Sequence, residues 1–259
     1  MRNILVSAIS FVNHSKIGSE IYTTFAKRLV NDVLTKTPYD IQITTNSYDN
    51  FSDVIDNERV FIREDNLETH KTHVGAFNQL LKFTAIKNID KKYDWVLYLD
   101  CDAGFVEPLN VGILESKMNE WESMGYDMIA LRTDATYEYA EKEYLESTQR
   151  NDGNKKLFDD KFRFYGIRPE WRGSKLPSEH IFLVKNNDKL EIMSEEFEKF
   201  CYTFESQDPN NIITFDMEAF EIGVSAFLAG YNMGEMGWNN QNEILKVGFN
   251  YNNWENIKI

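Results

Sequence analysis

Cysteine is scarce in this chain of 259 residues: there are only two, Cys101 and Cys201. Two cysteines cannot build the disulfide framework of a small secreted domain, and no Cys/His cluster has the spacing of a zinc site. We therefore expect a reducing compartment and predict a cytoplasmic location.

Basic residues are also few, since 28 Lys and Arg stand against 42 Asp and Glu and give a net charge of −14. Proteins that bind nucleic acid or anionic membranes non-specifically need a basic face. We therefore expect no nucleic-acid partner. A phosphate ligand remains compatible with this charge, provided that a cation bridges it to the protein.

Long apolar runs are missing as well, and no stretch approaches the roughly 20 residues of a membrane span. We therefore expect no integral membrane segment. The first twelve residues hold one arginine, a short apolar stretch and no clear cleavage site, so we interpret them as a strand rather than a signal peptide. Repeats, linkers and low-complexity tracts are absent too, which favours one compact domain over residues 1–259.

What the chain does have is a core-forming composition, with 42% hydrophobic and 14% aromatic residues. Residue periodicity predicts strands at 4–11, 40–45, 60–62, 95–99, 127–131 and 180–185, and helices at 20–35, 74–89, 111–124, 191–204 and 215–229. Strands and helices that alternate in this way form βαβ units around a parallel sheet. A polar, Gly-containing stretch at about 135–175 breaks this pattern, and we interpret it as an insertion that covers substrate or is merely structural.

One short run is especially informative: an apolar segment, 95–99, ends in Asp100 and Asp102, with Cys101 between them. The apolar residues predict a strand buried on both faces, whose carboxyl end is where open α/β sheets bind ligands. Two adjacent carboxylates repel each other and are costly to desolvate, and a divalent cation removes both problems. Mg²⁺ or Mn²⁺ takes oxygen ligands and leaves positions for phosphates. The run therefore predicts a metal–phosphate site, with Cys101 packed into the core.

The βαβ units of about the first hundred residues end in Tyr98-Leu99-Asp100-Cys101-Asp102. This combination resembles the GT-A glycosyltransferases. The resemblance implies a Rossmann-like, three-layer α/β/α fold with a mostly parallel central sheet. It also implies a nucleotide-sugar donor half at 1–105 and an acceptor half at 106–259. Such enzymes transfer a sugar from a nucleotide-diphosphate donor, and the Asp-x-Asp pair holds Mn²⁺ or Mg²⁺ against the diphosphate. The acceptor is not specified, and a glycan is the expected class.

The resemblance also implies roles for individual residues. Asp102 is the first candidate for direct metal ligation, while Asp100 is expected to bind the metal, a metal-bound water or a donor ribose hydroxyl. The family often adds a histidine ligand after the sheet, and His180 is the only histidine there. A structural histidine is the alternative. Lys82 is expected to reach the donor phosphates or the acidic pair, and a solvated lysine is its alternative.

Further candidates come from fold analogy. The donor base and ribose are expected beyond the first and third strands, near Ser7, Ile9, Phe11 and Asp65. Three aromatic residues are candidate platforms for the acceptor sugar, although a Trp more often belongs to the core. They are Trp171, Tyr231 and Trp238.

The catalytic base is less well defined. In the family, a Glu-Asp pair opens a helix that ends in Ala-Gly-aromatic, as this chain does at 229–231. Glu218 aligns with the family's Glu, but Ala219 stands in place of the Asp that is the general base of inverting enzymes. Asp216 or Glu218 could serve instead, or the enzyme could be retaining. Asp216 could also simply complement the helix dipole.

Three alternatives remain open at this stage. A phosphohydrolase of the haloacid dehalogenase type also uses hydrophobic-Asp-x-Asp, with the first Asp as nucleophile, but places it at the start of its core. A nucleotidyltransferase needs a Gly-rich loop after the first strand, where this chain offers only Gly18. A non-catalytic protein that binds a nucleotide sugar or a metal is the third.

Overall fold

A computed structural model describes residues 1–11, 20–65, 82–131, 135–136, 175–178, 180–205, 218–237 and 241–249. Its strands are β1 (Ile4–Ser10), β2 (Asp40–Thr45), β3 (Val60–Glu64), β4 (Trp95–Leu99), β5 (Ala103–Phe105), β6 (Met128–Ala130), β7 (Ala135–Thr136), β8 (Lys175–Leu176), β9 (Ile181–Lys185), β10 (Met233–Glu235) and β11 (Val247–Phe249). Its helices are α1 (Glu20–Lys36), α3 (Val111–Ser123), α6 (Asp188–Glu205) and α7 (Glu218–Leu228), with short turns η1 (Tyr48–Phe51) and η4 (Gln241–Leu245).

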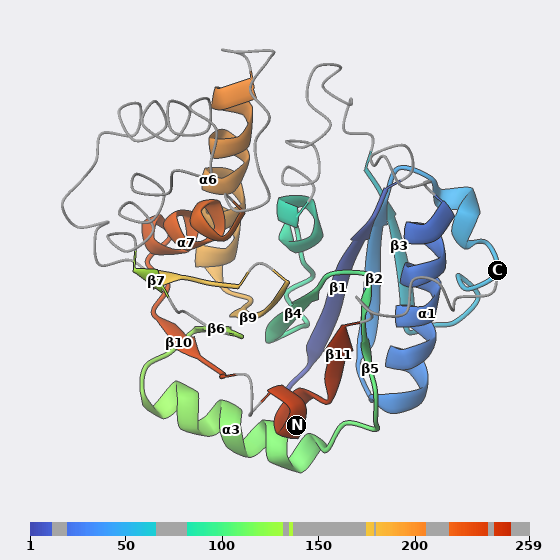
Figure 1. Cartoon of the computed structure of the whole chain (residues 1–259), viewed down its shortest axis with the longest axis horizontal. Coiled ribbons are helices and arrows are strands. Elements are labelled where there is room, and N and C mark those ends of the chain that lie inside the picture. The colour runs from blue at the N-terminus through green and yellow to red at the C-terminus, as the bar shows by residue number, and fades with distance from the viewer. Residues whose placement is uncertain are drawn as a thin grey trace, which may run out of the picture.

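The centre of the molecule is a 7-stranded sheet in the order β10-β6-β9-β4-β1-β2-β3 (Figure 1). Strand β1 pairs in parallel with β2 on one side and with β4 on the other. Only β9 runs antiparallel, to both β4 and β6. The prediction of an α/β fold with a mostly parallel central sheet is thus confirmed.

Helices cover both faces of this sheet, because successive strand residues point to opposite sides. Ile4 and Val6 of β1 pack into a cluster that also holds Phe25 of α1 and Leu114 of α3, whereas Leu5 packs against the opposite layer. That second layer contains residues 82–86, α6 and α7. In Figure 1, α1 and α7 accordingly lie on opposite sides of the strands. The described elements form three layers.

Most predicted boundaries agree with the structure within one residue, but α6 begins at Asp188 rather than at 191, and two other boundaries differ for identifiable reasons. The strand predicted at 60–62 extends to Glu64, because β2 continues beside it and pairs Thr45 with Glu64. The helix predicted to reach residue 89 has its last helical residue at 86. Asn88 has a φ of 55°, a left-handed conformation that ends a helix. Ile89 still packs into the core, from outside the helix.

Two small sheets flank the central one. Strand β5, directly after the acidic pair, pairs with β11 near the chain's end, and Phe105 lies opposite Val247. Strands β7 and β8 pair Ala135 with Leu176. The two ends of the predicted insertion therefore meet, while residues 137–174 lie outside the described part of the chain.

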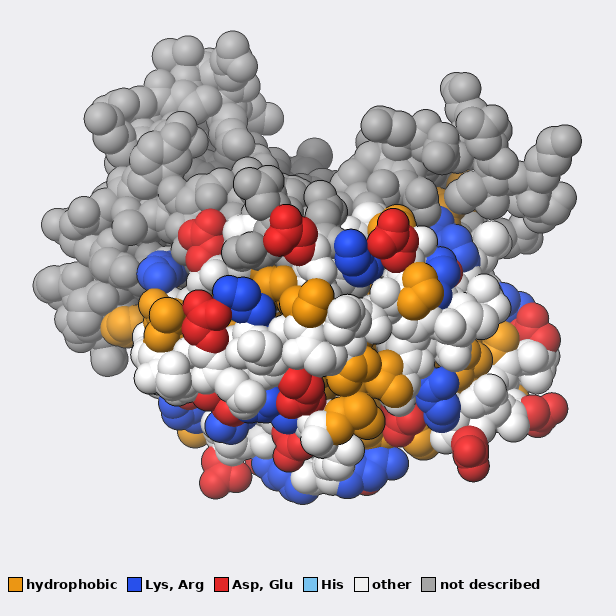
Figure 2. Space-filling view, turned by 90° about the horizontal axis from the view of Figure 1, so that it is seen from below, with side chains coloured by type: hydrophobic (Ala, Val, Ile, Leu, Met, Phe, Trp, Pro, Cys, Tyr) orange, Lys and Arg blue, Asp and Glu red, His pale blue; other side chains and the backbone are white. Residues whose placement is uncertain are grey.

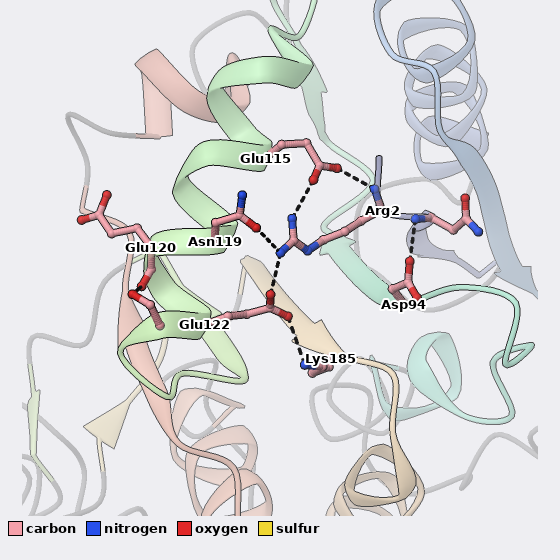
Figure 3. A network of polar contacts seen from close by, with 9 residues as sticks. Arg2, Asp94, Glu115, Asn119, Glu120, Glu122 and Lys185 are labelled. Atoms are coloured by element: carbon pink, nitrogen blue, oxygen red, sulfur yellow. Dashed lines mark hydrogen bonds and ion pairs between the residues drawn. The ribbon is translucent and has the colours of Figure 1, made fainter.

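A polar network lies at the end of the sheet where β1 begins (Figure 3). The Arg2 guanidinium donates to Glu115 at 2.6 Å, to Asn119 at 2.6 Å and to Glu122 at 2.5 Å, all on α3. Lys185, at the end of β9, donates to the other oxygen of Glu122 at 3.0 Å. The network joins α3 to two strands that are not neighbours in the sheet.

The face of the molecule seen in Figure 2 lies on the side of α3, and there acidic and basic side chains are interspersed. Among the described residues, no continuous basic surface appears in this view. None of the described helices combines the length and the apolar character needed to cross a bilayer.

Candidate functional site

The acidic pair lies where the order of strands in the sheet reverses direction. From β1 the chain proceeds outward to β2 and β3, and then returns to place β4 on the other side of β1. In open α/β sheets, ligands bind at the carboxyl ends of the strands at such a switch point. Asp100 and Asp102 follow the last residue of β4 at this position.

The carboxylate of Asp100 is held by three side chains. The Tyr98 hydroxyl donates to Oδ1 at 2.8 Å, and Lys82 Nζ lies 3.2 Å from the same oxygen. His180 Nδ1 lies 2.6 Å from Oδ2, and the Asp100 amide donates to the His180 carbonyl at 3.0 Å. Both oxygens of Asp100 are therefore engaged by protein groups.

These partners determine the charge of Asp100. Burial disfavours its charged form, but the Lys82 ammonium and the hydrogen bonds from His180 and Tyr98 outweigh burial, so the pKa of Asp100 lies below its ordinary value. The Lys82 side chain is only 6% exposed, and its ammonium lies 5.7 Å from the centre of the Tyr98 ring. The predicted alternative of a solvated lysine at position 82 is wrong, because this lysine is buried against the acidic pair.

Asp102 is in the opposite situation. Burial and the negative charge of Asp100 raise the pKa of Asp102 above its ordinary value. Asp102 is only partly exposed to solvent, yet its carboxylate forms no ion pair with any of the described residues. Cys101 between the two is 6% exposed and packs into the core, as predicted.

Helix α1 holds the backbone that follows the acidic pair. One guanidinium nitrogen of Arg28 donates hydrogen bonds to the Asp102 carbonyl at 2.7 Å and to the Ala103 carbonyl at 3.1 Å. Lys36, two turns further along α1, donates to the Phe105 carbonyl. The backbone from 102 to 105 is thus fixed from the helix side.

The residues predicted beside the donor base and ribose differ in exposure: Ser7 is buried, whereas Ile9 and Asp65 are partly exposed. Ser7 is fully buried, and its hydroxyl donates to the Ala85 carbonyl at 2.5 Å, which favours a structural role in joining β1 to residues 82–86. Ile9 is partly exposed and packs on the same layer. Asp65 follows β3 directly and lies 3.8 Å from the Arg63 guanidinium.

The predicted catalytic and acceptor-binding residues lie mostly outside what the structure describes. Asp216, Trp171 and Trp238 are outside the described residues, and Glu218 is described only as the first residue of α7. Tyr231 is 7% exposed, and its hydroxyl donates to the carbonyl of Lys185 at 2.7 Å. Lys185 pairs with Trp95, the first residue of β4. Tyr231 therefore lies near the amino-terminal end of β4, whereas the acidic pair follows its carboxyl end. Its predicted role as a sugar platform is wrong.

Two residues of the site were not anticipated. Tyr98 of β4 precedes Asp100 by two positions, and residues two apart in an extended chain share a face, so strand periodicity could have indicated it. Arg28 lies 74 positions before Asp102 and contacts its backbone, for which the sequence near the motif carries no signal. His180 and Lys82 were anticipated, and the structure brings both to Asp100.

The donor set fits a cation that is bound largely by its substrate. Among the described residues, no group of three or more His, Cys, Asp and Glu side chains is arranged to hold a metal ion. Mg²⁺ and Mn²⁺ sites on phosphate substrates commonly use one or two carboxylates, with waters and phosphate oxygens as the other ligands. Asp102 fits that requirement, whereas both oxygens of Asp100 already contact protein groups.

Comparison with models of known protein families finds no match for this sequence, and comparison with curated proteins finds none either.

Proposed function

We propose that this protein is a glycosyltransferase that takes its sugar from a nucleotide-diphosphate donor and depends on Mn²⁺ or Mg²⁺. The observation that carries the proposal is the contrast between two carboxylates at the switch point of the sheet. Asp100 is paired with the Lys82 ammonium and contacts His180 Nδ1, whereas Asp102 has no ion-pair partner in the described chain. A site of this kind has one carboxylate left for a cation.

The chemistry of the proposed reaction agrees with this charge arrangement. When a glycosyl bond to a diphosphate breaks, negative charge accumulates on the leaving group and must be stabilised there. A divalent cation held by Asp102 would supply that stabilisation as a Lewis acid. The short Asp102 side chain would keep a cation near the backbone that follows β4, and β4 itself is buried and paired on both sides in the sheet.

Asp100 has a different role in this proposal, which is to orient other groups. It fixes the His180 ring through Nδ1 and holds the Lys82 ammonium beside the site. Should His180 also bind the cation, the ligand would be Nε2, because Nδ1 faces Asp100. Carboxylates that orient a metal-binding histidine in this way are a common second layer around metal sites.

The same contacts argue against the phosphohydrolase alternative. In that mechanism the first Asp of the motif attacks phosphorus, so one of its oxygens must face the substrate. Both oxygens of Asp100 instead accept hydrogen bonds or an ion pair from the protein. A non-catalytic nucleotide-sugar-binding protein differs from a transferase only in turnover, which an assay decides.

A thermal-shift screen tests the proposed binding site. Nucleoside diphosphates and nucleotide sugars are added with Mn²⁺ or with a chelator to wild type, Asp102→Asn and the control Asp188→Asn. Asp188 is a fully exposed carboxylate on α6. A ligand that binds only the folded state stabilises it by about 2.7 kcal/mol at a hundredfold excess over its Kd. We expect a Mn²⁺-dependent shift in wild type and Asp188→Asn that Asp102→Asn lacks. A shift that ignores both metal and Asp102 would contradict the proposal.

A further inference from the structure

We propose that Arg28 of α1 is a positioning residue for the metal-binding carboxylate of Asp102. This inference rests on the function proposed above, in which Asp102 holds the cation. Arg28 touches neither the carboxylate nor any substrate in our proposal, and it acts through the backbone of residues 102 and 103.

Arg28 directs two hydrogen bonds at the backbone of residues 102 and 103, and its guanidinium also lies 5.4 Å from the centre of the Phe25 ring. One guanidinium nitrogen lies 2.7 Å from the carbonyl oxygen of Asp102 and 3.1 Å from that of Ala103. Two consecutive carbonyls held by one donor fix the peptide plane between these residues, and with it the backbone angle from which the Asp102 side chain departs. Hydrogen bonds to a charged donor are stronger than neutral ones, so this restraint is substantial.

Arg28 belongs to a charged stripe on α1 formed by Arg28, Asp32 and Lys36. Residues four apart share one face of a helix. Lys36 bonds Asp32 at 2.6 Å and also donates to the Phe105 carbonyl. A side chain at position 104 would place its Cβ 2.6 Å from Asp32 Oδ2, so Gly104 permits the close approach of this stripe to β5.

The charged stripe does not supply the apolar core contacts of α1. The core contacts of α1 are made by other residues, among them Phe25, Leu29 and Val33, all buried. On its other side, β5 is already paired with β11 through Gly104 and Gly248. Arg28 thus adds a restraint to a strand that helix packing and strand pairing already hold, and it adds that restraint at the metal-binding residue.

The test uses the Mn²⁺ complexes of ADP, GDP, CDP and UDP as its probes, with binding measured by isothermal titration calorimetry. Wild type, Arg28→Met, Arg28→Lys, Lys36→Met and the control Lys27→Met are titrated at one pH and salt concentration. Lys27 neighbours Arg28 but pairs with Asp53 on the surface. Loss of groups that orient metal ligands typically weakens metal affinity 10- to 100-fold. We expect at least about a tenfold weaker Kd in Arg28→Met and an intermediate value in Arg28→Lys, which keeps the charge but loses the planar fork.

Lys36→Met separates positioning from general stabilisation, because Lys36 belongs to the same stripe but holds the backbone three residues beyond Asp102. A merely structural stripe predicts that both variants melt at lower temperature and bind the Mn²⁺–nucleotide complexes alike. Positioning predicts that only the Arg28 variants lose affinity. Hydrogen exchange at the Ala103 amide, which donates to the Asp100 carbonyl, should also be faster in Arg28→Met than in Lys36→Met.

The two levels of the account fail in different ways. If Arg28→Met or Arg28→Lys folds and binds the Mn²⁺–nucleotide complexes with the same Kd as wild type, the proposed role of Arg28 is overturned. The proposed metal site is then unaffected. Wild type that binds none of these Mn²⁺–nucleotide complexes, or Asp102→Asn that binds them equally well, would overturn the proposed metal site and the role of Arg28 with it. Should Arg28→Met not fold, Arg28→Lys decides the question by the same criterion.

Discussion

At the scale of single residues, the site is defined by two carboxylates that differ in charge environment although one residue apart. Asp100 has its pKa lowered, since Lys82, His180 and Tyr98 outweigh the effect of its burial. Asp102 has its pKa raised by burial and by the charge of Asp100. The negative charge of Asp102 is unfavourable when no cation is bound. A cation would remove this electrostatic cost on binding, which favours binding at Asp102.

Replacing Asp102 should therefore not destabilise the protein. A folded pKa above the unfolded one means that the protonated form is favoured by folding, and this contribution is lost as pH rises through the folded pKa. At pH 7 ionised Asp102 is a liability, so Asp102→Asn should unfold in urea with a free energy within about 0.5 kcal/mol of wild type or above it. The measurement is made with a chelator present.

Replacing Asp100 should have the opposite effect. Asp100→Asn removes the carboxylate that compensates a lysine side chain only 6% exposed. Replacing the charged partner of a buried ammonium is destabilising, and with part of the pair exposed we expect about 2 kcal/mol. Equal losses for Asp100→Asn and Asp102→Asn in the same urea titrations would contradict the division of roles.

The residues of the site could be predicted to the extent that they are local. Asp100 and Asp102 follow directly from an apolar run with charges at its end. His180 and Lys82 required the family resemblance, and their contact with Asp100 depends on strand order and helix packing that spacing does not encode. Arg28 could not be predicted, because its partner is a backbone carbonyl, which every residue possesses.

At the scale of elements, α3 is fastened to the start of β1 and the end of β9 by Arg2, Glu115, Glu122 and Lys185 (Figure 3). The side chains of Arg2, Glu115 and Glu122 are between 17% and 29% exposed, so solvent screens their attraction only in part. Such a network holds elements together that share no strand pairing.

Removing Arg2 should cost measurable stability. Arg2→Met leaves two carboxylates on α3 without their shared partner, and we expect a loss of about 2 kcal/mol in urea unfolding. Lys117→Met is the matched control on the same helix, since its pair with Glu120 is more exposed and should contribute at most about 0.5 kcal/mol. Similar losses from the two variants would show that the network adds nothing beyond a surface ion pair.

The same network predicts how stability responds to acid. Burial raises the pKa of Glu122, but its hydrogen bonds from Arg2 and Lys185 outweigh this and leave the pKa below its ordinary value. A depressed carboxyl pKa contributes stability that is present above the unfolded pKa and lost as pH falls through the folded one. Glu122→Gln should therefore be less stable than wild type at pH 7, and the difference should shrink below the ordinary glutamate range. A difference independent of pH would contradict this assignment.

Element boundaries were predictable where local patterns determine them. The strands Asp40–Thr45 and Trp95–Leu99 have the predicted bounds, the first from alternating apolar residues and the second from a continuous apolar run. The early end of the helix at residue 86 was not predictable, because the apolar spacing continues to Ile89 and only the left-handed conformation of Asn88 interrupts it.

At the scale of the whole molecule, the order of the strands gives the acidic pair its meaning. The sequence predicts strands and a parallel arrangement from their alternation with helices. It does not predict that β4 returns beside β1 or that β9 inserts antiparallel between β4 and β6, because these pairings join residues far apart in the chain. That order places Asp102 at the switch point and His180 beside Asp100.

The most direct test of the central claim is an assay of the products formed from nucleotide sugars. Wild type and Asp102→Asn are incubated with candidate donors and Mn²⁺ or a chelator, with a panel of glycan acceptors and without acceptor. The account predicts release of nucleoside diphosphate by wild type with Mn²⁺, stimulated by an acceptor that gains the sugar, and none by Asp102→Asn. Release of inorganic phosphate from phosphoesters, or donor binding without any turnover, would contradict it.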